Sequence, residues 1–324
     1  MDRRRFLKLS GVTGYLSLAV FFWYKVAYNI YLGYGKNVKT QNVSKKVRSD
    51  LSPSSHESQI GGYGVETTYG SITVSKDGRK VDVLDASTET VDEHSDTIDT
   101  QKPSLNLLPI HLDRLESGDF TVKPMSMEDF FDYTRENHTN PYLVGVVRGK
   151  NYLEKREEVT DFTDTNPSNP EKFLNSLSDN FKRKTSYDVP RYIAGSITYH
   201  VLMGEYDVRD LLEHEVDYEA LNENQNTRMF CNEYTDRAIE GLYSTPPDSQ
   251  PPPVFAGDVW DKRHKHSYNA VASIVTDGRD IEIPVTFVDY TYTTLYDDFG
   301  IDELFGKDID AYNNHHRITA IDWV

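Results

Sequence analysis

Three residues of this chain have side chains that could carry covalent chemistry together. Cys231 is the only cysteine in the sequence, His266 follows it by 35 residues, and Asp289 follows His266 by another 23. A thiol can attack a carbonyl carbon when an imidazole takes and holds its proton, and a carboxylate can fix the orientation of that imidazole. The residue types and their order therefore predict a triad with Cys231 as nucleophile, His266 as base and Asp289 as orienting acid.

Two strand-like runs are predicted to carry His266 and Asp289. Residues 266–274 and residues 281–290 each alternate with the period of two that is typical of strands. Between the runs stands Asp277-Gly278, a strong short hairpin signal because both central residues of a type I′ turn need positive φ. The sequence therefore predicts an antiparallel hairpin.

The expected turn also sets a register for this hairpin. If Asp277-Gly278 is a two-residue turn, His266 lies directly opposite Asp289, with Cβ atoms roughly 5 Å apart. Pro284 then faces Val271 at a pair without hydrogen bonds, where its missing N–H costs the ladder nothing. A β-bulge would move Asp289 to the other face, so this register is the weakest step of the prediction.

A helix is predicted to position the thiol. Residues 229–243 carry apolar residues at helical spacing after Cys231, and the unpaired N–H groups at a helix start stabilise a thiolate. We expect this helix to cover the apolar face of the hairpin. An oxyanion hole needs donors beside the sulfur, and the Cys231 backbone N–H is one. Gln225 is a second candidate and Tyr199 a weaker one, although either can be an ordinary polar residue.

The N-terminus resembles an export signal. Arg3-Arg4-Arg5-Phe6-Leu7-Lys8 nearly matches the twin-arginine pattern, and an apolar stretch over residues 11–32 is about long enough to span a bilayer. Residues 1–33 are therefore predicted to be a twin-arginine signal or an uncleaved membrane anchor, with the rest on the extracellular face or secreted. A basic patch before an ordinary anchor is the alternative.

Composition limits the possible partners. The net charge is −17, from 52 acidic and 35 basic residues, so nucleic-acid binding is not expected. Acids spread along the whole chain are typical of halophilic proteins from salty surroundings. A single cysteine cannot form an internal disulfide, and taken alone it is more often a buried, inert residue. The histidine and aspartate downstream favour a reactive thiol.

The chain divides into a polar and a globular part. Residues 34–104 are predicted to be a mostly disordered linker with one small hairpin, pairing 71–74 with 80–83. Residues 105–324 are long enough for one domain of class α+β. The other elements predicted are helices at 126–133, from 170, at 191–203, 208–214 and 302–305, strands at 142–147 and 318–324, and a stiff exposed proline loop at 246–253.

Three stretches resemble the transglutaminase-like branch of the papain-like cysteine peptidase superfamily: Met229-Phe230-Cys231-Asn232-Glu233-Tyr234-Thr235, His266-Ser267-Tyr268-Asn269-Ala270-Val271 and Val285-Thr286-Phe287-Val288-Asp289-Tyr290-Thr291. The resemblance covers about 170–298. It implies a helix bearing Cys231 packed on an antiparallel sheet bearing His266 and Asp289. Many members of the family have glycine where Met229 stands and tryptophan where Tyr268 stands.

A metal site is the alternative use of the histidines. His264 and His266 are two residues apart, and His315-His316 with Asp258, Asp261 or Asp297 could add ligands. No HExxH or paired-cysteine pattern supports this, so we expect neither metal nor cofactor.

The predicted function is acyl transfer at an amide of a protein or peptide substrate. Peptide or isopeptide hydrolysis is favoured over amine transfer to glutamine, because water is the default acceptor in an open site. The alternative is a cell-surface binding or structural protein that keeps the fold without turnover. An enzyme would need Cys231 partly exposed beside His266, whereas a binding module would bury it. The oligomeric state is not indicated by the sequence.

Overall fold

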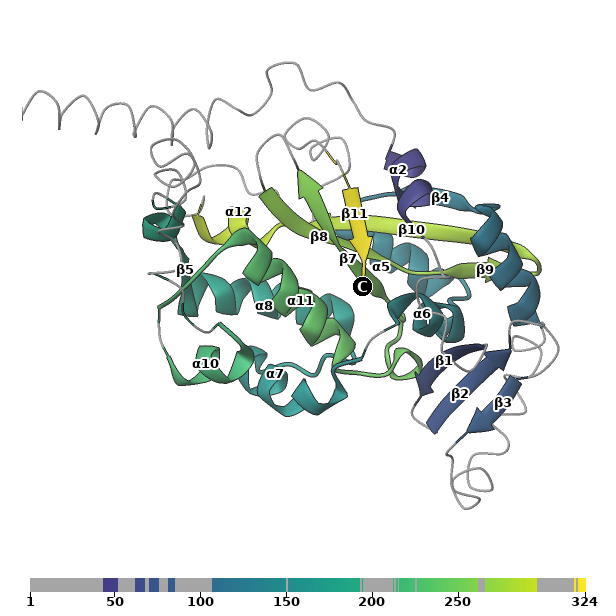
Figure 1. Ribbon diagram of the computed structural model, residues 1–324, viewed down its shortest axis with the longest axis horizontal. Helices are drawn as coiled ribbons and strands as arrows, with labels where there is room; N and C mark the ends of the chain where they lie inside the picture. The colour runs from purple at the N-terminus through teal and green to yellow at the C-terminus, as the bar shows by residue number, and fades with distance from the viewer. Residues whose placement is uncertain are drawn as a thin grey trace, which may run out of the picture.

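The structure is a computed structural model of the 324-residue chain (Figure 1). It describes residues 43–51, 62–67, 70–75, 81–84, 107–149, 151–192, 194, 212, 214, 216–224, 226–261, 266–295, 318 and 320–324. Among these residues no helix is both long and apolar enough to cross a bilayer. The predicted signal or anchor at 1–33, the helix at 302–305, and most of the helices at 191–203 and 208–214 lie outside the described residues.

A mixed sheet forms the centre of the molecule. Its strand order is β11 (Ala320–Trp323), β7 (Phe255–Asp261), β8 (His266–Ala272), β10 (Asp280–Val288) and β4 (Thr121–Pro124), and β9 (Val275–Asp277) also pairs with β10. Only the pairing of β10 with β4 is parallel; the others are antiparallel. The predicted α+β class is therefore confirmed. The strands predicted at 266–274, 281–290 and 318–324 exist, but β8 ends at Ala272, β10 ends at Val288 and β11 spans only Ala320–Trp323.

The helices cover both faces of the sheet. All residues of β8 are buried. α11 (Cys231–Tyr243) packs against β8 and β7, α5 (Met127–Glu136) against β10, and α6 (Pro141–Arg148) against β7. In Figure 1, α7 (Arg156–Thr163), α8 (Pro170–Lys184) and α10 (Tyr218–Glu223) lie with α11 below and to the left of the sheet.

The hairpin that carries His266 has a different register from the predicted one. Asp280 pairs with Asp277, so the two central residues of the turn are Gly278 and Arg279. Gly278 has a positive φ of 57°, whereas Arg279 does not have a positive φ. This agrees with a type II′ turn, which needs positive φ only at its first central residue. The expected opposition of His266 and Asp289 is therefore wrong by two residues. An even displacement keeps every side chain on its predicted face.

The prediction that Pro284 costs the ladder nothing is also wrong. Pro284 meets Ser273, whose N–H donates to the Pro284 carbonyl at 3.2 Å, instead of Val271. Because proline has no N–H to return this bond, the ladder is interrupted between Ala272, where β8 ends, and Val275, where β9 begins.

Two predicted helices are confirmed with their caps. Ser126 accepts a hydrogen bond from the Asp129 N–H at 3.1 Å at the start of α5. Asn169 accepts one from the Lys172 N–H at 3.0 Å at the start of α8, which has proline in its first turn. In both cases a local side-chain signal sets the helix start.

The strand predicted at 142–147 is wrong, because these residues belong to helix α6. Asn140 caps the helix by accepting from the Leu143 N–H at 3.2 Å, Pro141 occupies its first turn, and Gly149 ends it with φ 61. The run is apolar all round and buried, so its periodicity could not separate strand from helix.

Within the predicted linker at 34–104 the structure adds elements that the sequence did not reveal. The predicted hairpin is present as β2 (Gly70–Ser75) and β3 (Val81–Leu84), and a third strand, β1 (Gly62–Thr67), joins it. Helix α2 (Val43–Asp50) packs against β4 and β11 and buries Val43 and Val47. Its amphipathic pattern is only two turns long and lies in a polar stretch.

The proline loop at 246–253 is half buried, contrary to the prediction of an exposed loop, and only Pro251 is exposed in it. Pro247, Pro252 and Pro253 are buried. Arg148, fully buried at the end of α6, donates to the Val254 and Thr245 carbonyls at 2.8 Å each and to Gln250. Burial lowers the pKa of Arg148 to about 10. The loop therefore anchors the end of α11 to α6.

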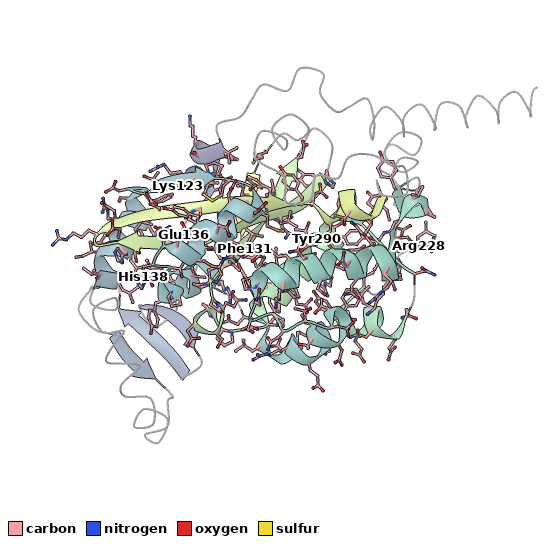
Figure 2. All side chains as sticks on the ribbon, turned by 180° about the vertical axis from the view of Figure 1, so that it is seen from behind. Lys123, Phe131, Glu136, His138, Arg228 and Tyr290 are labelled. Atoms are coloured by element: carbon pink, nitrogen blue, oxygen red, sulfur yellow. The ribbon has the colours of Figure 1, made fainter. Side chains whose placement is uncertain are left out.

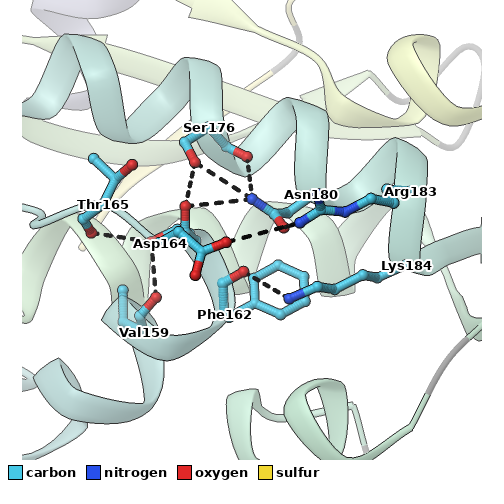
Figure 3. A network of polar contacts seen from close by, with 9 residues as sticks. Val159, Phe162, Asp164, Thr165, Ser176, Asn180, Arg183 and Lys184 are labelled. Carbon is cyan, nitrogen blue, oxygen red and sulfur yellow. Dashed lines mark hydrogen bonds and ion pairs between the residues drawn. The ribbon is translucent and has the colours of Figure 1, made fainter.

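Side chains of α8 hold the end of α7. Ser176 and Asn180 both donate to the Thr163 carbonyl, and the Lys184 ammonium donates to the Phe162 carbonyl at 2.9 Å (Figure 3). The last carbonyls of a helix have no partner within the helix, so these bonds satisfy groups that would otherwise be unpaired.

The same helix supports the elements of the predicted site. The Phe181 ring of α8 makes edge contacts with Tyr234 of α11 at 4.9 Å and with Tyr290 of α12 (Tyr290–Leu295) at 5.2 Å between ring centroids. Tyr290 follows Asp289 directly. Helix α8 therefore fixes α11, which carries Cys231, relative to the start of α12.

Candidate active site

A buried histidine–aspartate pair lies at the centre of the candidate site. The His266 Nε2 lies 2.6 Å from the Asp289 Oδ2. His266 is 7% exposed and Asp289 is 0% exposed. The other carboxylate oxygen, Oδ1, accepts the Thr291 N–H at 3.0 Å. Asp289 is therefore held from both sides, and it holds the imidazole in turn.

Cys231 completes this group. It is the first residue of α11, as the sequence predicted, and it is 9% exposed. Its thiol interacts with the His266 side chain. The structure thus brings Cys231, His266 and Asp289 together, although their catalytic role stays a prediction.

The environment of His266 favours its charged form. Burial lowers the pKa of His266, but the Asp289 charge and hydrogen bond, with a smaller contribution from Cys231, raise it well above its ordinary value. An imidazole of raised basicity holds a proton taken from a neighbouring thiol. The arrangement is therefore suited to an ion pair between thiolate and imidazolium.

The ring of Tyr268 packs on the imidazole, and the ring of Phe287 packs on Tyr268. Tyr268 stacks on His266 with 5.9 Å between ring centroids and 22° between planes, and Phe287 makes an edge contact with Tyr268 at 6.0 Å. Burial, followed by the charges of Asp261 and Asp289, raises the pKa of Tyr268 well above its ordinary value. Tyr268 therefore stays a neutral phenol, and its ring limits the rotation of His266.

Short elements deliver Cys231 to this position. β6 (Thr227–Met229) pairs in parallel with β5 (Thr185–Tyr187), and α11 begins two residues after β6 ends. One turn into α11, the Thr235 carbonyl accepts the Asn269 side-chain N–H at 3.1 Å. The helix is thereby tied to β8 close to His266. In Figure 2, Tyr290 and Arg228 of β6 lie toward one end of the molecule, and Lys123 of β4 lies toward the other end.

Asp258 is a titratable neighbour whose state the sequence did not indicate. Burial raises its pKa, and although a weak hydrogen bond from Ser267 at 3.5 Å and the nearby His266 charge lower it, the pKa is about 6. The sequence suggested Asp258 only as a possible metal ligand. Its burial results from the pairing of β7 with β8, and no local pattern encodes that.

The predicted oxyanion donors are placed only in part. Gln225 and Tyr199 lie outside the described residues. The backbone N–H of Cys231 is in the first turn of α11, where helix N–H groups have no acceptor within the helix. It is therefore the described donor closest in the chain to the thiol.

The possible metal ligands do not gather in the part of the chain that the structure describes. No three of its His, Cys, Asp or Glu side chains lie close enough together to hold a metal ion. His264, Asp297, His315 and His316 lie outside the described residues.

Comparison with family models, with curated proteins and with solved structures gave no match to this chain. The relation to transglutaminase-like proteins therefore stays a resemblance carried by the three sequence stretches quoted above.

Proposed function

We propose that this protein is a cysteine enzyme that transfers acyl groups at amide bonds, with Cys231 as nucleophile, His266 as base and Asp289 as orienting acid. The observation that carries the proposal is the interaction of a helix-start thiol with an imidazole whose Nε2 lies 2.6 Å from a fully buried carboxylate. A structural cysteine needs neither partner.

The residues suggest a two-step reaction. The Cys231 Sγ bonds to the substrate carbonyl carbon while His266 holds the thiol proton. The carbon–nitrogen bond then breaks, His266 gives the proton to the leaving amine, and a thioester remains on Cys231. Water attacks the thioester, giving a carboxylic acid and restoring the thiol, and an amine in place of water would give a new amide.

The fold agrees with this proposal at a coarse level. A helix bearing the cysteine packs on an antiparallel-dominated sheet bearing the histidine, with the aspartate directly after the next strand. This is the arrangement that a papain-like, transglutaminase-like core implies, and we infer that residues 170–298 form such a core.

We further infer that the enzyme acts outside the cytoplasm on proteins or peptides. The twin-arginine pattern at residues 3–8 supports export, and the net charge of −17 disfavours nucleic acid as a partner. The residues from 1 to 33 would either be removed or hold the protein at the membrane.

One observation favours a second candidate, a binding or structural protein without turnover. Cys231 is buried, with 9% of its surface exposed, as expected for a binding module. The triad outweighs this observation, because an imidazole of raised pKa next to a thiol has no evident use in a passive domain.

The two candidates differ in covalent chemistry. The wild type and a Cys231→Ala variant would be incubated with a peptide mixture and with peptides joined by a glutamine–lysine isopeptide bond, with and without a primary amine. Mass spectrometry should detect cleavage, or amine incorporation, and a thioester on Cys231 only in the wild type. If the wild type gave neither product nor adduct, the binding-protein candidate would replace the enzyme.

A further inference from the structure

A buried arginine contacts the first turn of the helix that carries Cys231. Arg191 is 4% exposed, and its guanidinium lies 4.2 Å from the centre of the Phe230 ring. It forms ion pairs with Glu233 and, at 3.5 Å, with Asp188. Phe230 and Glu233 lie one residue before and two residues after Cys231, so the guanidinium contacts both sides of the thiol-bearing residue.

Each partner of Arg191 is itself fixed to the backbone. Glu233 accepts the Phe230 N–H at 2.6 Å, which closes the first turn of α11. Asp188, fully buried, accepts the Arg191 N–H at 2.9 Å, and its own N–H donates to the Met229 carbonyl at 3.0 Å. The whole group therefore ties residues 188–191 to Met229 and Phe230, before Cys231, and to Glu233, after it.

We propose that Arg191 is a positioning residue for the nucleophile. It fixes Phe230 and the first turn of α11, and through them the direction of the Cys231 thiol toward His266 and that of the Cys231 backbone N–H. This inference rests on the proposed function, because only an enzyme needs the thiol held to within a fraction of an ångström.

The chemistry of the side chain explains why an arginine stands here. A planar guanidinium can stack on a ring while it pairs with two carboxylates, whereas a lysine ammonium is a point charge without a flat face. Arg191 also pairs with the carboxylates of Asp188 and of Glu233, which follows Cys231 by two residues.

The test uses two variants of the group and a matched control on the same helix. Arg191→Lys keeps the positive charge but loses the planar guanidinium that pairs with two carboxylates and stacks on the Phe230 ring. Glu233→Gln loses the ion pair, while its amide oxygen can still accept the Phe230 N–H. The control, Arg237→Lys, alters an ion pair of the same kind, Arg237 with Glu240 at 2.7 Å, farther along α11. For each protein the rate of Cys231 alkylation by iodoacetamide would be followed against pH, with the unfolding temperature.

Both variants should be alkylated roughly 10- to 100-fold more slowly than the wild type near about pH 6, with the loss shrinking at alkaline pH. Arg237→Lys should keep the wild-type pH profile. Alkylation of both Arg191→Lys and Glu233→Gln within about twofold of the wild type, while His266→Ala is slow, would overturn the positioning role and leave the enzyme intact. If Arg191→Lys does not fold, Glu233→Gln decides. A wild-type rate that does not depend on His266 would instead contradict the proposed function.

Discussion

At the scale of single residues, the chemistry depends on how firmly Asp289 holds His266. The carboxylate is fully buried, bonds to Nε2 at 2.6 Å and accepts a backbone N–H with its other oxygen. The sequence predicted this pair from strand alternation and a turn signal. The pair survives because the observed register differs by an even number of residues, so both side chains keep their face.

Asp289→Asn should weaken the reactivity of Cys231. The variant removes the charge that raises the pKa of His266, so the imidazole is a weaker base for the thiol proton. We expect alkylation by iodoacetamide near about pH 6 to slow by on the order of 10²-fold. An unchanged rate would mean that Asp289 only supports the fold.

The same pair predicts how stability depends on pH. Because the folded pKa of His266 is raised, its contribution to the free energy of unfolding is fully present below the unfolded value of 6.5 and is lost as pH rises through the folded pKa. In urea denaturation, the free energy of unfolding of the wild type should therefore exceed that of Asp289→Asn most below pH 6.5. The difference should shrink at alkaline pH. A difference that grows with pH would contradict the assigned direction.

At the scale of elements, the sequence predicted the features that local side-chain signals determine, but not those that depend on tertiary packing. Capping residues set the starts of α5 and α8, and the Asp-Gly signal predicted a hairpin that exists. The turn lies one residue later than predicted, because Gly278 has positive φ and Asp277 does not. The α6 run was misread because burial on all sides removes the periodicity that separates helix from strand.

The packing of α11 gives a prediction at this scale. A Cβ on Gly241 would lie 2.3 Å from the Phe173 ring and 2.7 Å from the Tyr218 hydroxyl, both buried. Gly241→Ala should therefore lower the free energy of unfolding by about 1–3 kcal/mol, although alanine is the better helix former.

The control for this variant is Asp179→Ala, at an exposed position of helix α8. It should change the free energy of unfolding by no more than about 0.5 kcal/mol in the same urea titration. If Gly241→Ala were instead stabilising, the close approach of α8 and α10 to α11 would be wrong.

At the scale of the whole molecule, segments far apart in the sequence complete the core. β4 and β7 join the central sheet, and α2 packs against β4 and β11. None of these was predicted. α2 and β4 are short and gain their stability from partners that are distant in the chain, whereas β7 pairs with the neighbouring β8 and with the distant β11. The Asp50 carboxylate, for example, accepts the Ile321 N–H at 2.9 Å.

Docking of α2 can be tested with two substitutions on the same helix. Val47 is fully buried and Lys45 is exposed. Val47→Ala should lower the free energy of unfolding by about 1–3 kcal/mol, and Lys45→Ala by no more than about 0.5 kcal/mol. Equal small effects in urea denaturation would show that residues 43–51 are not part of the folded core.

The central claim is that Cys231 and His266 work as a reactive pair. Its most direct test is the rate of Cys231 alkylation by iodoacetamide in the folded protein, from about pH 4 to about pH 9, for the wild type and His266→Ala. The account predicts fast alkylation of the wild type already at acidic to neutral pH and a loss of that reactivity in the variant. Slow alkylation of both proteins, with the same dependence on pH, would show an inert cysteine and contradict the account.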